Sequence, residues 1–163
     1  MGLDISIKLN KEIASEKLRN KFYTWSNEYA SDEIGCLSRD FCNMVLSQHS
    51  DSGEPIISEL SKVLSFDCKF LQEPKVNHIE EDEDTRYQFG WVNSISYLNN
   101  LKIVKTLVQS NSDMSSKIDL SEDWKYYFSG QDKYSFQQDI DHLIEVLEIG
   151  NLQGLTEICY SVG

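Results

Sequence analysis

The chain of 163 residues lacks the short motifs that identify most enzymes and metal sites. Its four cysteines form no CxxC pair, and its three histidines stand alone without the HExxH spacing, so no zinc or redox-pair site is expected. No GxSxG or SxxK stretch offers an activated nucleophile, and singly scattered glycines cannot form a phosphate-binding loop. We therefore predict no catalytic, cofactor-binding or metal-binding residue.

A long apolar run and a secretory start are also missing. No stretch approaches the roughly 20 apolar residues needed to span a bilayer, and the start Met1-Gly2-Leu3-Asp4 carries no basic segment followed by an apolar one. We expect a cytoplasmic protein that is not integral to a membrane. In that compartment Cys36, Cys42, Cys68 and Cys159 should be reduced thiols, each buried or half-buried.

Negative charge is what the sequence has in excess. The net charge is −12, and residues 1–50, with seven acids and six bases, contribute only −1 of it. A field of this sign repels nucleic acid phosphates and anionic membranes, and it speeds encounter with a basic protein. We expect no nucleic acid or membrane partner and a basic protein partner, with simple solubility as the alternative explanation of the charge.

Residues 135–150 carry the clearest helix pattern in the chain. Ser135 is placed to cap the first amides, Gln138 follows at the spacing of a capping box, and Gly150 is a typical helix stop. One face of this helix is apolar and the opposite face carries carboxylates. Similar periodicity predicts further helices, so that the full set lies near 15–30, 38–49, 54–65, 93–109 and 135–149.

Alternation of apolar and polar residues predicts the strands. It is clear at the two ends of the chain, over 3–9 and 156–162, which we expect to be neighbours in the sheet. Three aromatic segments are also predicted to be strands, namely 66–71, 87–91 and 124–128, with a helical turn as the alternative for 124–128. The fold class is therefore α+β: one globular domain over 1–163, with a small, mainly antiparallel sheet covered by about five helices.

Three further predictions concern single residues and one loop. The run Glu80 to Asp84 should be a solvated loop, with cation binding beside His78 as the alternative. His142 is expected on the outer side of its helix, where neighbouring acids would favour its protonated form. Trp25 and Trp91 are predicted to lie in the core.

The function that these features favour is a non-enzymatic acidic interaction protein, such as a toxin-neutralising immunity protein or a phage-encoded inhibitor of a basic partner. The alternative is an enzyme or small-ligand-binding module whose site is dispersed in sequence. Mimicry of DNA is a third interpretation, disfavoured by the near-neutral first fifty residues. The predicted partner-binding residues are acidic or aromatic: Asp141, Glu145, Glu148, Glu122, Asp123 and Trp124.

Two stretches resemble a loose group of small, acidic, uncharacterised phage and bacterial proteins. The first is the opening Met1-Gly2-Leu3-Asp4-Ile5, which is followed by a strand. The second is the tail, where the segment WKYYFSG precedes an acidic helix and a closing aromatic strand. The resemblance covers about a fifth of the chain, implies a prokaryotic or viral setting, and brings no catalytic residue with it.

Overall fold

The computed structural model describes residues 5–22, 30–46, 54–74, 76–81, 84–129 and 134–162. Trp25 and residues 82–83 of the acidic run lie outside these ranges.

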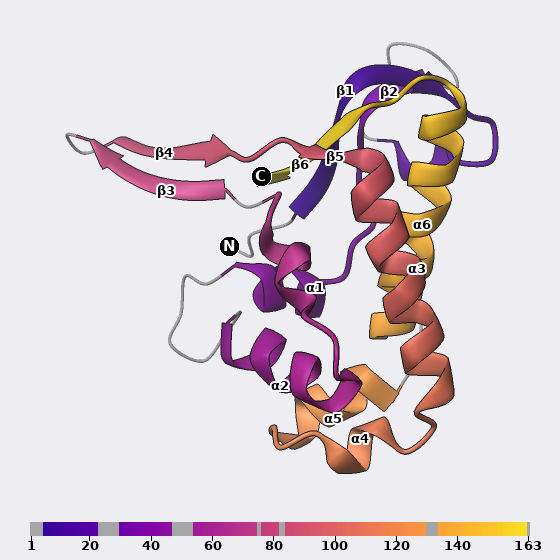
Figure 1. Ribbon diagram of the computed structural model, residues 1–163. Coiled ribbons are helices and arrows are strands. Elements are labelled where there is room, and N and C mark those ends of the chain that lie inside the picture. The colour runs from indigo at the N-terminus through magenta and orange to yellow at the C-terminus, as the bar shows by residue number, and fades with distance from the viewer. Residues whose placement is uncertain are drawn as a thin grey trace.

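A four-stranded antiparallel sheet occupies one end of the molecule, in the order β2-β1-β6-β5 (Figure 1). β1 (Ile5–Ala14) pairs with β6 (Glu157–Val162), so the first and last strands are neighbours as predicted. β1 also pairs with β2 (Ala30–Ile34), while β6 pairs with the two-residue β5 (Val92–Asn93). Together with the helices this sheet confirms the α+β class.

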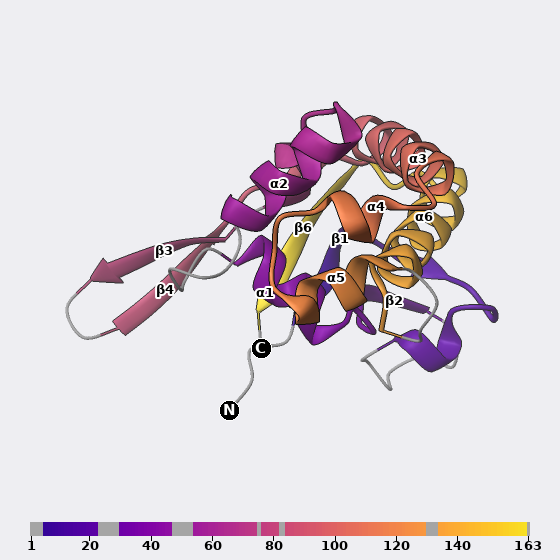
Figure 2. The same cartoon turned by 90° about the horizontal axis from the view of Figure 1, so that it is seen from below.

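A separate hairpin projects from the side of the sheet, away from the helices (Figures 1 and 2). It consists of β3 (Val76–Glu81) and β4 (Asp84–Phe89), paired antiparallel from Val76 with Phe89 to Glu81 with Asp84. The predicted strand at 87–91 is therefore confirmed only as far as Phe89. The prediction of a loop at Glu80 to Asp84 is wrong at both ends of the run, because these residues belong to the paired strands.

The helices form the rest of the body. α3 (Ser94–Ser110) and α6 (Phe136–Leu152) pack against each other. The remaining α-helices of the described residues are α1 (Arg39–Val45), α2 (Glu54–Leu64), α4 (Met114–Lys117) and α5 (Glu122–Ser129), joined by two short 3₁₀ helices, η1 (Arg19–Lys21) and η2 (Cys68–Gln72). α4 and α5 lie at the end of the molecule away from the sheet (Figure 1).

Three predicted helices have nearly the predicted bounds, namely α2, α3 and α6. α6 begins as expected, with the Ser135 hydroxyl accepting from the Gln138 amide at 3.3 Å. The predicted stop is wrong, since the helix continues through Gly150 to Leu152. The Ser38 cap of α1 is also present, but that helix ends at Val45, and 47–50 lie outside the described residues.

Three other segments differ in type from the prediction. Residues 15–22 form a turn and η1, residues 23–29 lie outside the described ranges, and Ala30 begins β2. β2 pairs with the edge of β1 at both of its ends, with an irregularity between Lys8 and Ile13. Residues 68–72 form η2, in which the consecutive residues Phe70 and Leu71 are both buried. In a strand with one buried face, consecutive side chains point to opposite faces, so only one of the two would be buried. Residues 122–129 form α5.

A single cluster of buried side chains joins the sheet to the helices. β1 contributes Ile5, Ile7, Leu9 and Ile13, all at most 2 % exposed, while Lys8 and Asn10 alternate toward the other face. Every residue of the predicted apolar stripe on α6 is buried: Phe136, Ile140, Leu143, Ile144 and Leu147.

Candidate functional site

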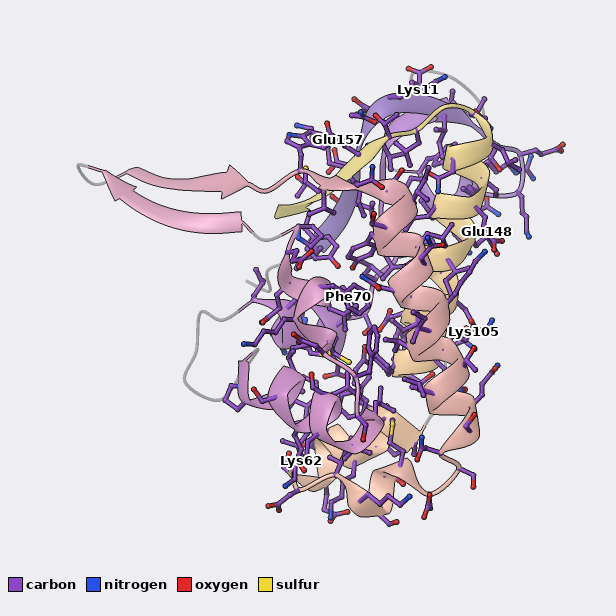
Figure 3. The ribbon with its side chains drawn as sticks, viewed as in Figure 1. Lys11, Lys62, Phe70, Lys105, Glu148 and Glu157 are labelled. Carbon is purple, nitrogen blue, oxygen red and sulfur yellow. The ribbon has the colours of Figure 1, made fainter. Side chains whose placement is uncertain are left out.

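The predicted acidic row on α6 is paired with lysines. The carboxylate of Asp141 lies 2.7 Å from the Lys105 ammonium, and that of Glu148 lies 3.0 Å from Lys102. Figure 3 shows Lys105 and Glu148 along the same outer side of the α3 and α6 pair. These lysines stand on α3, far away in sequence, so sequence spacing alone gave no sign of the pairing.

Glu145 is neutralised from the other side of α6. Its two carboxylate oxygens lie 3.6 Å from Lys17 and 3.4 Å from Lys21, in the connection that follows β1. Ion pairs at a surface stabilise by at most about 1 kcal/mol each, but they cancel the local charge. The row therefore does not offer three free carboxylates to a partner.

The other three predicted contacts lie on α5 and have different surroundings. Glu122 is almost fully exposed, with a single long contact of 3.7 Å to Lys125. Asp123 is exposed, whereas Trp124 is partly buried against the core, with ring centroids 5.8 Å from Tyr127 and 6.2 Å from Phe128. The contacts of Trp124 with Tyr127 and Phe128 join residues three and four positions apart, which are neighbours on a helix and not on a strand. The predicted strand at 124–128 is therefore wrong.

Asp123 lies near a second carboxylate that the sequence analysis did not single out. This is Asp40, an exposed residue in the first turn of α1. The pKa of Asp40 is raised, first by partial burial and second by the negative charge of Asp123. Within the described part of the chain neither aspartate forms an ion pair with a lysine or arginine.

An exposed aromatic residue stands beside these acids. Tyr126 is 65 % exposed, and it lines a wide, open hollow of about 600 Å³ together with Glu122 and Asp123. We call Asp40, Glu122, Asp123 and Tyr126 the acidic corner. The sequence did not decide between core and surface for Tyr126, because the alternating-strand interpretation of its segment gave no information on exposure.

A buried aspartate holds the helices of this corner together. Asp139 of α6 is 4 % exposed, and its carboxylate accepts hydrogen bonds from the Ser38 amide at 2.9 Å, the Ser38 hydroxyl at 2.5 Å and the Tyr127 hydroxyl at 2.7 Å. Burial raises the pKa of Asp139, while these hydrogen bonds oppose the shift by stabilising the charged form. Asp139 thus connects the start of α1 to α5 and α6.

His142, one turn further along α6, is buried and not on the outer side as predicted. Its Nε2 lies 2.7 Å from the Gly35 carbonyl oxygen and donates to it, whereas Nδ1 has no hydrogen-bond partner among the described residues. Burial lowers the pKa of His142, so the expectation of a favoured protonated form is wrong. The nearby Lys21 adds to this shift and Glu145 opposes it.

A smaller, more enclosed cleft lies where α3 ends and α6 begins. Its volume is about 260 Å³. The floor consists of the buried apolar side chains of Val108, Met114 and Phe128. Among the described residues, the walls carry uncharged polar side chains, which are Gln109, Asn111, Ser112, Ser115, Ser129 and Gln137.

The remaining predictions concern metal sites, membrane-spanning segments, the cysteines and Trp91. Within the described ranges no group of three or more acidic, cysteine or histidine side chains is arranged to hold a metal ion, and no helix there is long and apolar enough to cross a membrane. All four cysteines are described and none forms a disulfide, but Cys36 is exposed, contrary to expectation. Trp91 is 41 % exposed and so is not a core residue.

Comparison of the chain with known protein families, with curated proteins and with solved structures finds no match.

Proposed function

We propose that this protein is a non-enzymatic binding protein that presents its acidic corner to a basic protein partner, as a toxin-neutralising immunity protein or a phage-encoded inhibitor does. The observation that carries the proposal is that, in addition to partial burial, the negative charge of Asp123 acts on Asp40 and helps to raise its pKa, while no lysine or arginine of the described residues pairs with either carboxylate. Like charges held close together destabilise the free protein, and a lysine or arginine of a partner placed between them removes that cost.

Tyr126 supports the same proposal. An exposed tyrosine next to carboxylates supplies apolar contact area and a π face for a cation, and aromatic residues are common at the energetic centre of interfaces. The three ion-paired carboxylates of α6 are left out of the proposed contact, since a partner would first have to displace their lysines.

The test is affinity capture of basic proteins by the immobilised chain, with two double variants matched in charge. Asp40→Asn with Asp123→Asn removes two charges from the acidic corner, and Asp141→Asn with Glu148→Gln removes two from the α6 row. We expect the first variant to lose at least about 10-fold in captured partner and the second to retain it. An equal loss in both, or a co-purifying metabolite in place of a basic protein, would contradict the proposal.

Stability separates a binding defect from a folding defect in this experiment. Because the Asp40 and Asp123 charges repel each other, removing both should leave the free energy of unfolding within about 1 kcal/mol of the wild-type value. A corner variant that unfolds more easily than that and fails to bind would count against a direct contact.

A further inference from the structure

We infer that the cleft between α3, α4, α5 and α6 is a binding site for a small uncharged polyol of the size of one sugar ring. This ligand is separate from the basic protein partner proposed above. The inference rests on the shape, the lining and the free hydrogen-bonding groups of the cleft.

The size of the cleft sets the size of the ligand. A volume of about 260 Å³ lies close to the lower end of the range for small-molecule sites, which begins at about 300 Å³. One sugar ring fits this space, whereas a nucleotide or a peptide segment does not.

The lining selects an uncharged ligand. About a quarter of the chain is charged, yet no charged side chain of the described residues lines this cleft. A ligand anion would meet the net charge of −12 with no cation to receive it, and a ligand cation would find no carboxylate. Burying either without a counter-charge costs several kcal/mol, so neutral compounds are favoured.

The hydrogen-bonding capacity of the walls points to hydroxyl groups on the ligand. The Asn111 amide and the Ser129 hydroxyl already donate to backbone carbonyls, at 2.8 Å to Leu107 and 2.7 Å to Tyr126. Ser129 keeps only its acceptor oxygen, whereas Asn111 keeps its carbonyl oxygen and one N–H. The side chains of Ser115 and Gln137 make no hydrogen bond within the described part of the chain.

The side chains of Ser112 and Gln109 likewise make no hydrogen bond among the described residues. The walls therefore offer donors and acceptors side by side. A hydroxyl group both donates and accepts, which suits such a mixture better than a pure acceptor or a pure donor does. The apolar floor of Val108, Met114 and Phe128 matches the C–H face of a sugar ring.

The test is an NMR titration of the isotope-labelled full chain with four probes: glucose and N-acetylglucosamine as neutral polyols, glucuronate as the anion and glucosamine as the cation. We expect saturable shifts of backbone amides in 108–115, 128–129 and 137 with a neutral probe, at millimolar affinity. The charged probes should bind at least about 10-fold more weakly.

Two variants locate the site. Ser115→Tyr fills the cleft and should weaken binding at least about 10-fold, whereas Ser116→Tyr, on the next and exposed position of α4, should leave it unchanged. Gln137→Leu keeps the approximate size of the side chain but removes its amide, and it should weaken binding of the neutral probe. It is the test variant if Ser115→Tyr does not fold. Absence of saturable shifts at about 100 mM of either neutral probe, equal binding of glucuronate, or full binding by Gln137→Leu and a folded Ser115→Tyr would overturn the inference.

Discussion

The imidazole of His142 is buried in the folded protein. Among the described residues, only one of its two ring nitrogens, Nε2, has a hydrogen-bond partner. A second proton on this ring would place an uncompensated charge next to Lys21, with only the partly paired Glu145 to offset it. The neutral form is therefore the one that fits the fold.

We expect acidification to destabilise the protein through His142. Its folded pKa is lowered below the value of about 6.5 in an unfolded chain, so below that pH the unfolded state binds the extra proton first. The stabilising contribution is complete above pH 6.5 and is lost as the pH falls toward the folded pKa. Between pH 7.5 and 5.5, the loss in free energy of unfolding due to His142 is at most about 1.4 kcal/mol.

His142→Gln is the comparison, since both other histidines remain in that variant. Its stability should fall less than the wild-type stability over this range, as measured by urea unfolding at each pH. The range stops at pH 5.5 because Asp40 and Asp139, whose pKa values are raised, have the opposite effect at lower pH. Parallel pH profiles for the two proteins would contradict the prediction.

Gly150 shows how a residue that usually ends a helix is used inside one. The chain turns back after α6 so that Leu155, 2 % exposed, packs directly over the glycine. A Cβ atom at position 150 would lie 2.7 Å from Leu155 Cδ2 and 3.3 Å from its Cβ. The turn itself uses Gly154, whose φ of +91° is a conformation that other residues rarely adopt.

We predict that the effect of Gly150→Ala changes sign with the residue at position 155. In the wild-type background the crowding costs about 1–3 kcal/mol and outweighs the roughly 1 kcal/mol gain in helix propensity. In a Leu155→Ala background the 2.7 Å contact is removed and only the 3.3 Å contact to the Cβ atom of residue 155 remains, so the same substitution should stabilise by up to about 1 kcal/mol. Urea unfolding of the four proteins in this cycle measures the coupling, and a coupling near zero would show that position 150 is not crowded.

The elements that the sequence predicted well are those with one strongly apolar face. β1, β6, α2, α3 and α6 follow the periods of two or 3.6 residues, because each buries one face against a single core. α5 was not predicted as a helix, because its consecutive residues Tyr127 and Phe128 are both buried. Over a segment of five residues, such a run of buried aromatics does not distinguish a helix from a strand. β2 has few apolar residues and is defined by its pairing with β1.

The candidate site was predictable only in part for a related reason. Asp141, Glu145 and Glu148 of α6 were placed correctly on the outer face, but their counter-charges come from α3 or from residues 17–21. Pairings between distant segments depend on tertiary structure, which local spacing does not encode. The approach of Asp40 to Asp123, on two helices about eighty positions apart, was beyond reach for the same reason.

For the whole molecule, the net charge of −12 is distributed unevenly among the folded elements. Lysines neutralise the outer side of α6, while in the acidic corner Glu122 has only a long contact to Lys125, and Asp40 and Asp123 have no ion pair among the described residues. A further part of the negative charge stands in the projecting hairpin, which carries Glu80, Glu81 and Asp84 in its strands (Figure 1). Charge concentrated away from the lysines is what gives a basic partner a preferred direction of approach.

Asp139 links these regions, and its removal should therefore affect the whole fold. In Asp139→Ala the hydroxyl groups of Ser38 and Tyr127 lose a buried charged acceptor, at a cost of about 3 kcal/mol or more in free energy of unfolding. Tyr127→Phe removes one of the three hydrogen bonds and should cost about 1–2 kcal/mol. Asp141→Ala, which breaks only a surface ion pair with Lys105, should cost less than about 1 kcal/mol.

Urea unfolding at pH 7.5 measures the order of these three variants. Hydrogen exchange gives a second readout, because Ser38 caps α1 and its hydroxyl loses an anchor in Asp139→Ala. The amides in the first turn of α1 should then exchange faster in Asp139→Ala than in Asp141→Ala, beyond any difference in global stability. If Asp139→Ala and Asp141→Ala were equally stable, the buried carboxylate would not be what holds α1 and α5 against α6, and the geometry of the acidic corner would need another support.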